Sequence, residues 1–277
     1  MTDGAGGSDG SVRLGLTLPT FVDDPEVLVA VARDAEAAGL DGVFTYDHLY
    51  RIRSAGAGPS LSLEPVLGLL AAETERIAFG SFMARATLRP PATLCTVLCT
   101  VHRMAPGRLI AGIGSGDSLS NDENEMFGLA GTDVPTRLSA LEATVTTVAG
   151  QGFPVWVGGT WDPVLAVAAS CADGWNSWNT KVATFAGEWE RLRNACHVAG
   201  RHEVVPTWGG LVELRPDRWD EVAGRDDVLS GSWDAIAEGV RAYVEAGARW
   251  VVLAPLAPGD PDNGAVVAAE LAPRIRA

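Results

Sequence analysis

The stretch Ile77–Ile113, IAFGSFMARATLRPPATLCTVLCTVHRMAPGRLIAGI, contains the pattern that decides the fold. An apolar run at Ile77–Phe82 precedes a helical segment that the Pro90-Pro91 pair opens and that continues to about Met104, and a second apolar run follows at Arg108–Ile113. Proline suits the first turn of a helix, because the N–H that it lacks has no partner there. Strands that alternate with helices are parallel neighbours with right-handed crossovers. The stretch therefore predicts a β-α-β unit.

The same alternation repeats along the chain. The predicted strands are Val12–Leu18, Leu40–Tyr46, Ile77–Phe82, Arg108–Ile113, Pro154–Val157, Gly174–Trp178, Val204–Leu211 and Trp250–Leu253. The predicted helices are Glu26–Ala38, Leu63–Glu73, Pro90 to about Met104, Thr136–Ala149, Pro163–Ser170, Val182–Ala199, Trp233–Ala246 and Gly264–Arg276. The strands are continuously apolar, as in a sheet that is buried on both faces. Repetition without a Gly-x-Gly-x-x-Gly opening favours a closed (β/α)8 barrel, a TIM barrel of the α/β class, over an open doubly wound sheet. No linker interrupts it, so we expect one barrel domain over residues 12–277.

Charge and composition exclude several classes of protein. The 277 residues include 21 basic and 35 acidic ones, a net charge of −14, which argues against binding to nucleic acid or to anionic membranes. No apolar stretch approaches the ~18 residues of a membrane-spanning helix. Residues 1–11 are rich in Gly, Ser and Asp, which predicts a disordered tail rather than a signal peptide. Four cysteines make no disulfide framework in a chain this long, so we expect a cytoplasmic protein in which Cys95 and Cys99 are buried small hydrophobes and no metal is bound.

Candidate catalytic residues follow the second and fourth predicted strands. In a (β/α)8 barrel the active site lies in the loops after the carboxyl ends of the strands. His48 directly follows the second strand beside Asp47, and an imidazole suits proton transfer near neutral pH. Asp117 follows the fourth strand, from which it could face His48 and share the proton transfer. A structural interpretation stays open, in which Asp117 bonds its own turn and Asp47 caps the next element.

Two glycine-containing loops are predicted to bind a ligand. Gly114-Ser115-Gly116-Asp117-Ser118 lets backbone amides approach a ligand, although tight turns need glycine as well. Gly158-Gly159-Thr160 leads into a helix for which Asp162 is the expected N-cap and Pro163 the first residue. Amides at the positive end of that helix predict a phosphate site, and in barrels phosphate is often bound near the late strands.

Tryptophans near the late strand ends predict a flat apolar wall. Trp175, Trp178 and Trp208 lie at or near the ends of their strands, where they could contact an aromatic ring system. We include Trp178 and Trp208 in the predicted substrate pocket, together with Thr20 after the first strand. Trp156 lies inside a strand and is assigned to the core.

Short motifs occur in a characteristic order along the chain. They are Leu14-Gly15-Leu16, Gly39-Leu40-Asp41-Gly42-Val43 leading into Asp47-His48, Thr74-Glu75-Arg76-Ile77-Ala78-Phe79-Gly80, Arg108-Leu109-Ile110-Ala111-Gly112-Ile113-Gly114-Ser115-Gly116, Pro154-Val155-Trp156-Val157-Gly158-Gly159, Ala172-Asp173-Gly174-Trp175-Asn176 and Tyr243-Val244-Glu245-Ala246-Gly247-Ala248. The ordered set, which extends from Val12 to about Leu253, resembles the luciferase-like monooxygenase superfamily of flavin- or deazaflavin-dependent (β/α)8 barrels.

The resemblance implies a ring system of the isoalloxazine type in the barrel mouth. It places the cofactor phosphate at Gly158-Gly159-Thr160 and the Asp47-His48 pair against the ring or the substrate, and it makes Asp117 a proton donor. A non-prolyl cis peptide bond near Gly80-Ser81-Phe82 would buttress the ring. Asn176, in the sixth strand motif, joins the predicted cofactor contacts. Gly116-Asp117-Ser118-Leu119 is more similar to the coenzyme F420 branch than to the FMN branch, whose members usually have Gly-Trp in this loop.

The leading hypothesis is an F420-dependent oxidoreductase that transfers a hydride between the coenzyme and a small organic substrate. The alternatives are an FMN-dependent monooxygenase supplied by a reductase partner, and a non-catalytic protein that binds F420 or flavin. A phosphosugar isomerase or aldolase is disfavoured because the only lysine, Lys181, lies outside the strands. The segment between Gly128 and Pro154 is shorter than in relatives, which predicts a missing lid and an open pocket. A homodimer is common among relatives and is compatible with the apolar helix faces.

Overall fold

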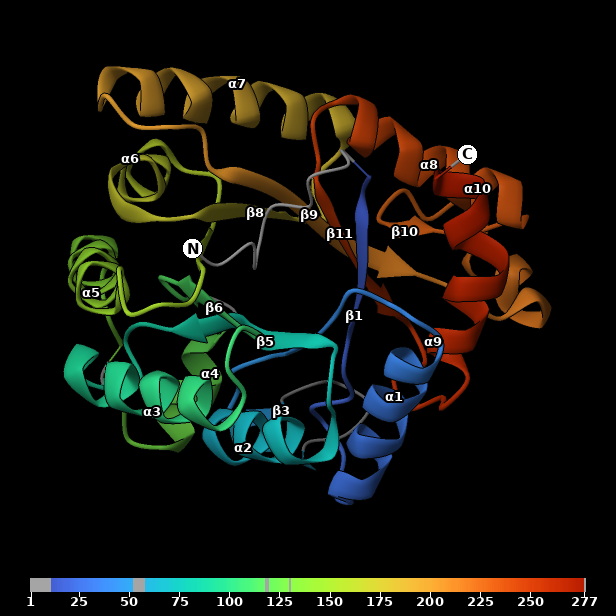
Figure 1. Ribbon diagram of the computed structural model, residues 1–277, viewed down its shortest axis with the longest axis horizontal. Helices are drawn as coiled ribbons and strands as arrows, with labels where there is room; N and C mark the ends of the chain where they lie inside the picture. The colour runs from blue at the N-terminus through green and yellow to red at the C-terminus, as the bar shows by residue number, and fades with distance from the viewer. Residues whose placement is uncertain (1–10, 52–57, 118–119, 130, 277) are drawn as a thin grey trace.

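A closed ring of parallel strands forms the centre of the molecule. The computed structural model describes residues 11–51, 58–117, 120–129 and 131–276. Within them, the strands pair in the ring order β1, β2, β5, β6, β7, β8, β9 and β11, and β11 pairs again with β1. Their bounds are β1 Arg13–Thr17, β2 Gly42–Thr45, β5 Ala78–Arg85, β6 Leu109–Gly114, β7 Val155–Gly158, β8 Gly174–Trp178, β9 Val205–Val212 and β11 Trp250–Pro255. The predicted (β/α)8 barrel is confirmed (Figure 1).

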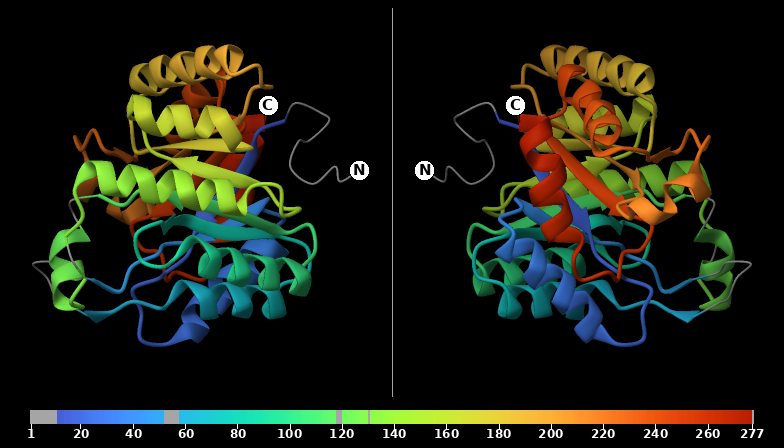
Figure 2. Two further views of the ribbon diagram at one scale, coloured as in Figure 1. Left: turned by 90° about the vertical axis from the view of Figure 1, so that its left-hand side faces the viewer. Right: turned by 90° about the vertical axis from the view of Figure 1, so that its right-hand side faces the viewer.

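Helices surround the strands, as Figures 1 and 2 show. Their bounds are α1 Pro25–Ala37, α2 Leu63–Glu73, α3 Pro91–Met104, α5 Val134–Val148, α6 Asp162–Cys171, α7 Val182–Val198 and α8 Trp233–Glu245, and the chain continues through α9 Asn263–Val266, a π-helical turn Val267–Leu271 and α10 Ala272–Arg276. Side-chain caps fix several starts: Asp24 accepts from the N–H of Glu26, and Asp133 from that of Thr136. None of the helices in the described part of the chain is long and apolar enough to cross a membrane.

Several short elements were absent from the sequence prediction. A two-stranded ribbon of β3 (Tyr50–Arg51) and β4 (Gly58–Pro59) follows β2, and β10 (Val228–Leu229) extends the pairing of β9. A 3-10 helix covers Pro216–Val222. Helix α4 (Asn121–Met126) lies in the polar, glycine-rich stretch Gly114–Asp133, for which the sequence predicts neither a helix nor a strand. Its six residues are almost all polar, so they carry no apolar periodicity by which a helix could be recognised.

The core has two layers. One fills the interior of the barrel and includes Phe44, Phe82, Trp156 and Trp250, with ring centroids of Phe44 and Trp156 5.4 Å apart. The other lies between the strands and the surrounding helices. Trp156 is therefore in the core, as predicted. The prediction for the Cys95-Cys99 pair is wrong in part, because both thiols are only half-buried on α3.

Candidate active site

A cavity of about 930 Å³ opens at the carboxyl ends of the strands. The loops that converge there bring together most of the predicted site residues. Those that line the cavity are Asp47, His48, Phe82, Gly114, Ser115, Gly116, Asp117, Gly158, Gly159, Thr160, Asn176 and Trp178. Thr20, Gly80, Ser81 and Trp208 are not among the lining residues, and Ser118 and residues 1–10 of the predicted tail lie outside the described part of the chain.

His48 is held at the edge of this cavity by a carboxylate that the sequence did not single out. Its Nδ1 lies 2.8 Å from Oε2 of Glu123, on α4. The side chain of His48 is 35% exposed, whereas that of Glu123 is 4% exposed. The backbone N–H of Leu49 and Nη2 of Arg85 each lie 2.5 Å from the other oxygen, Oε1. Glu123 therefore joins α4 to the ends of β2 and β5.

Asp47 lines the cavity and forms a buried ion pair. Its carboxylate accepts hydrogen bonds from Nη1 and Nη2 of Arg89 at 2.7 and 3.0 Å, and from the N–H of Arg85 at 2.7 Å. Burial lowers the pKa of the Arg89 guanidinium, but the hydrogen bonds and charges of Asp47 and Glu64 outweigh it, and the net shift is upward. These contacts give Asp47 a structural role, but they join it to β5 and Arg89 and are not the expected cap of the next element.

Asp117 lies on the cavity wall and also stabilises its own turn. Its Oδ1 accepts from the N–H of Ser120 at 3.2 Å and lies 3.4 Å from the Ser120 hydroxyl, just before α4 begins. These are the contacts within its own turn that the structural interpretation of Asp117 predicted. They leave the proposed proton transfer by Asp117 a prediction.

The predicted phosphate loop lies at the start of α6. Gly159, with φ of 133°, donates its N–H to the carbonyl of Asn176 at 3.1 Å, and Thr160 and Trp161 line the cavity. The expectation that Asp162 caps the helix is wrong: Trp161 takes the cap position, and Asp162 is the first helical residue. Its carboxylate forms an ion pair with Arg191 of α7 instead.

A buried acid supports this loop from the outer side of the barrel. Oε2 of Glu188, on α7, accepts from the Ser177 hydroxyl at 2.8 Å. Burial raises the pKa of the Glu188 carboxyl, and hydrogen bonds from Ser177 and Thr160 offset the rise only in part. The carboxyl therefore ties α7 to the ends of β7 and β8.

The aromatic wall contains one of the three tryptophans predicted for it. Trp178 is 41% exposed and contacts Tyr46 and Phe82, with centroid distances of 6.0 and 5.7 Å. Trp175 and Trp208 are buried on the outer face of the barrel, where Trp175 stacks on helix α7 and Trp208 on helix α8. The substrate-pocket assignment of Trp208 is therefore wrong. Side chains alternate between the two faces of a strand, so a position near its end does not place a residue in the mouth.

Thr20, Ser81 and Gly80 serve the barrel itself. Oγ1 of Thr20 lies 3.1 Å from Oγ1 of Thr45, and Ser81 donates to the carbonyl of Gly112 at 2.7 Å, both with side chains that are buried. A Cβ atom at Gly80 would lie 1.9 Å from the carbonyl oxygen of Ile110, so glycine is needed where β5 approaches β6. All three were predicted to contact substrate or cofactor, and the structure gives them contacts within the barrel wall instead.

The floor of the cavity is built around Met83, which the sequence did not indicate. The peptide bond between Phe82 and Met83 is cis, one residue beyond the stretch where the resemblance implied a cis bond. A Cβ atom at Gly158 would lie 2.6 Å from Cγ of Met83, and one at Gly114 would lie 3.1 Å from its Cβ. The two glycines therefore make room for this methionine. In the sequence, the only indication of this arrangement is that Gly114 and Gly158 belong to the two predicted ligand-binding loops.

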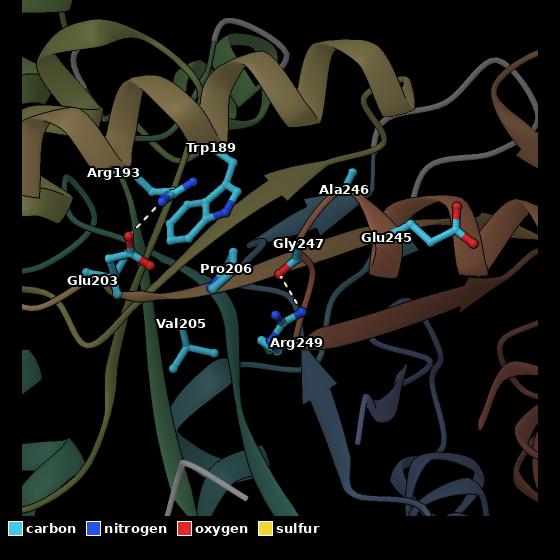
Figure 3. A pocket seen from close by; sticks show the side chains of 10 residues that line it. Trp189, Arg193, Glu203, Val205, Pro206, Glu245, Ala246, Gly247 and Arg249 are labelled. Carbon is cyan, nitrogen blue, oxygen red and sulfur yellow. Dashed lines mark hydrogen bonds and ion pairs between the residues drawn. The ribbon is translucent and has the colours of Figure 1, made fainter. Parts of the chain in front are cut away.

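A second cavity, of about 570 Å³, lies at the opposite end of the barrel. Figure 3 shows its lining, in which Arg193 forms an ion pair with Glu203 at 2.8 Å and Arg249 donates to the carbonyl of Gly247 at 3.2 Å. It adjoins the amino ends of β9 and β11, and none of the predicted site residues line it. Of these two cavities, the predicted site residues therefore line the first one.

Comparisons with known proteins agree with this architecture. The chain is 32% identical over 149 residues to an F420-dependent glucose-6-phosphate dehydrogenase of Nakamurella multipartita, which covers 53% of this chain and 41% of that protein. A protein of the same name from Beutenbergia cavernae is 38% identical over 110 residues, 39% of this chain and 32% of its own. The matches thus span less than half the length of these curated relatives.

Solved structures resemble the whole barrel at low sequence identity. An F420-dependent secondary alcohol dehydrogenase in complex with an F420-acetone adduct superposes with a TM-score of 0.82 and 15% identity, over 96% of this chain and all of the other. The F420-dependent tetrahydromethanopterin reductase from Methanopyrus kandleri gives a TM-score of 0.73 and 16% identity, over 96% of this chain and 99% of that one. The sequence model of the family described as luciferase-like monooxygenase matches residues 8–149, just over half of the 277. The chain belongs to the luciferase-like monooxygenase family.

Proposed function

We propose that this protein is an oxidoreductase that transfers a hydride between coenzyme F420 and a small organic substrate. The observation that carries the proposal is the placement of His48, whose Nδ1 is bound by Glu123 while its ring lines the cavity beside aromatic side chains. The curated relatives that match the chain are named as F420-dependent dehydrogenases, which supports the choice of coenzyme.

The cavity suits a flat, phosphate-bearing group. Its volume of about 930 Å³ lies in the range of small-molecule sites. Gly114 and Gly158 have no side chains that could cover Met83 on the floor of the cavity. In the proposal, Phe82 and Met83 lie under the ring, and the loop around Thr160 binds phosphate with the start of α6. When bound, the coenzyme supplies the carbon that accepts or donates hydride.

The protein's own groups handle the proton. We propose that Nε2 of His48 accepts the hydroxyl proton of an alcohol as the hydride leaves the neighbouring carbon, and returns it in the reverse direction. Asp117, on the same cavity, is the proposed second proton carrier. Phe82 and Trp178 exclude water from the space between them.

The rings around His48 favour an uncharged substrate. Phe21 and Tyr46 lie 5.4 and 6.4 Å from the imidazole, centroid to centroid. Among the described lining residues, the guanidinium groups are those of Arg85, which is paired with Glu123, and Arg137 on α5, between β6 and β7. Arg137 belongs to α5, whereas Phe21 and Tyr46, whose rings contact His48, follow β1 and β2. We therefore propose a neutral alcohol or carbonyl compound rather than a sugar phosphate as the substrate.

The test is a fluorescence titration of the purified protein with F420 and, separately, with FMN. Selective micromolar or tighter binding of F420 is expected, followed by turnover of neutral alcohols in preference to glucose 6-phosphate. Preference for FMN, with turnover that requires oxygen and a reductase, would point instead to a monooxygenase. Tight F420 binding without reduction by any donor would indicate a binding protein, and binding of neither would overturn the cofactor assignment. Sedimentation of the same sample tests the expected homodimer.

A further inference from the structure

Glu123 is a buried carboxylate whose partners come from two separate segments, the one that follows β2 and the end of β5. It is the buried residue of α4, among neighbours that are otherwise exposed or partly so. A carboxylate inside a protein is costly unless it is paired and hydrogen-bonded. Glu123 meets this condition through His48, Leu49 and Arg85, at 2.8, 2.5 and 2.5 Å. These three partners, among the described residues, all lie at or after strand ends rather than on its own helix.

The two oxygens of Glu123 have different partners. Oε1 accepts from the backbone N–H of Leu49 and from Nη2 of Arg85, both of which can only donate. Oε2 lies against Nδ1 of His48. Since a carboxylate can only accept, the neutral imidazole must carry its proton on Nδ1. Nε2 then presents a lone pair, and it has no hydrogen-bond partner among the described residues.

We propose that Glu123 is the positioning residue of the site, which fixes the tautomer of His48 so that Nε2 accepts a proton on the cavity side. The role of Nε2 in catalysis rests on the proposed function. The assignment of the His48 tautomer does not, because it follows from the contacts of Glu123 alone. In alcohol oxidation the O–H bond breaks toward Nε2 while the C–H bond releases its hydride to the coenzyme and the C=O bond forms. Glu123 stabilises the resulting imidazolium by its negative charge. It does not become protonated itself, and in this it resembles the carboxylate of a catalytic triad.

The substitution Glu123→Gln gives a directional test. An amide offers one accepting oxygen and one donating NH2 group. The N–H of Leu49 and Nη2 of Arg85 both require the oxygen at the Oε1 position, so the NH2 group must face His48. Nδ1 then has to accept, and the proton moves to Nε2. The matched control is Glu125→Gln, the same change of charge at an exposed position of α4.

The direct readout is the imidazole 15N spectrum of histidine-labelled protein, without coenzyme or substrate. Four histidines make the spectrum simple, and His48→Gln assigns the signal. We expect the Nδ1–H tautomer in the wild type and in Glu125→Gln, and the Nε2–H tautomer in Glu123→Gln. An Nε2–H tautomer in the wild type, or an unchanged tautomer in Glu123→Gln, would overturn the inference. Should Glu123→Gln fail to fold, the wild-type spectrum and that of Glu123→Asp, which retains the charge, still decide it.

Kinetics then separate this inference from the proposed function. With F420 and a substrate alcohol, Glu123→Gln is expected to lower kcat by roughly 10²–10⁴-fold, with KM and the coenzyme Kd within about threefold of the wild type. Glu125→Gln should match the wild type. Failure of the wild type to bind F420 would overturn the proposed function, whereas the 15N spectra would still test the role of Glu123. A reversed tautomer with unchanged kcat would remove the catalytic consequence.

Discussion

At the scale of single residues, two neighbours in the sequence have different roles. Asp47 makes a bidentate contact with Arg89 and accepts a hydrogen bond from the backbone N–H of Arg85. Its side chain is only 2% exposed. His48 keeps one ring nitrogen on the cavity side. Breaking a buried pair such as that of Asp47 typically costs about 3–5 kcal/mol of stability. Substitutions here must therefore be judged by stability and by turnover separately.

His48→Ala is expected to abolish most turnover while leaving the fold intact. Loss of a general acid–base group lowers rates by about 10²–10⁴-fold, and a partly exposed imidazole contributes little to the core. The measurement is steady-state kinetics with F420 and the substrate alcohol, alongside the coenzyme Kd and the thermal midpoint. Unchanged turnover and affinity would show that His48 is structural and that another base is needed.

At the scale of elements, a side chain of α1 anchors the entry to β5. Oε1 of Glu36 accepts the N–H groups of Glu75, Arg76 and Ile77 at 2.9, 2.6 and 2.9 Å. Burial by itself would raise the pKa of this carboxyl, but the backbone hydrogen bonds lower it below its ordinary 4.5. An acid whose folded pKa is lowered stabilises the fold above its ordinary pKa, and this contribution disappears as the pH falls through the folded pKa.

Glu36→Gln is therefore expected to destabilise the protein by about 1 kcal/mol at pH 7 and to make the loss of stability below about pH 4.5 shallower than in the wild type. The measurement is urea unfolding at a series of pH values, with Glu26→Gln, an exposed change on the same helix, as the control. Parallel pH curves for Glu36→Gln and the wild type would contradict the assignment.

The order and type of the main elements could be predicted because most barrel strands are apolar runs and several helices have recognisable ends. The cavity-lining residues were less predictable. Position at, near or after a strand end selected His48, Asp117 and Trp178, which line the cavity, yet it also selected Trp208, whose ring packs on α8. Glu123 lies in a polar segment without periodicity, so only its contacts with residues far away in the sequence reveal it.

At the scale of the whole molecule, the site depends on the close approach of strands across the barrel. The rings of Tyr46, after β2, and Trp178, at the end of β8, meet across the mouth although these strands lie opposite each other in the ring. This contact requires a narrow barrel. Next to β2 in the ring, β5 and its neighbour β6 approach so closely at Gly80 that no side chain fits beside the carbonyl of Ile110. The spacing of β5 and β6 at this point is therefore fixed by a backbone contact.

Gly80→Ala tests this dependence. The added methyl group would overlap a backbone carbonyl, which cannot rotate away as a side chain can, so we expect a loss of about 1–3 kcal/mol or more in the free energy of unfolding. Gly68→Ala is the matched control, because a Cβ at this position of α2 meets nothing within 4 Å and alanine favours the helix by about 0.5–1 kcal/mol. Urea unfolding measures both. If Gly80→Ala were as stable as the wild type, β5 and β6 would separate at little cost. The barrel wall could then not fix the distance between His48 and the groups opposite it.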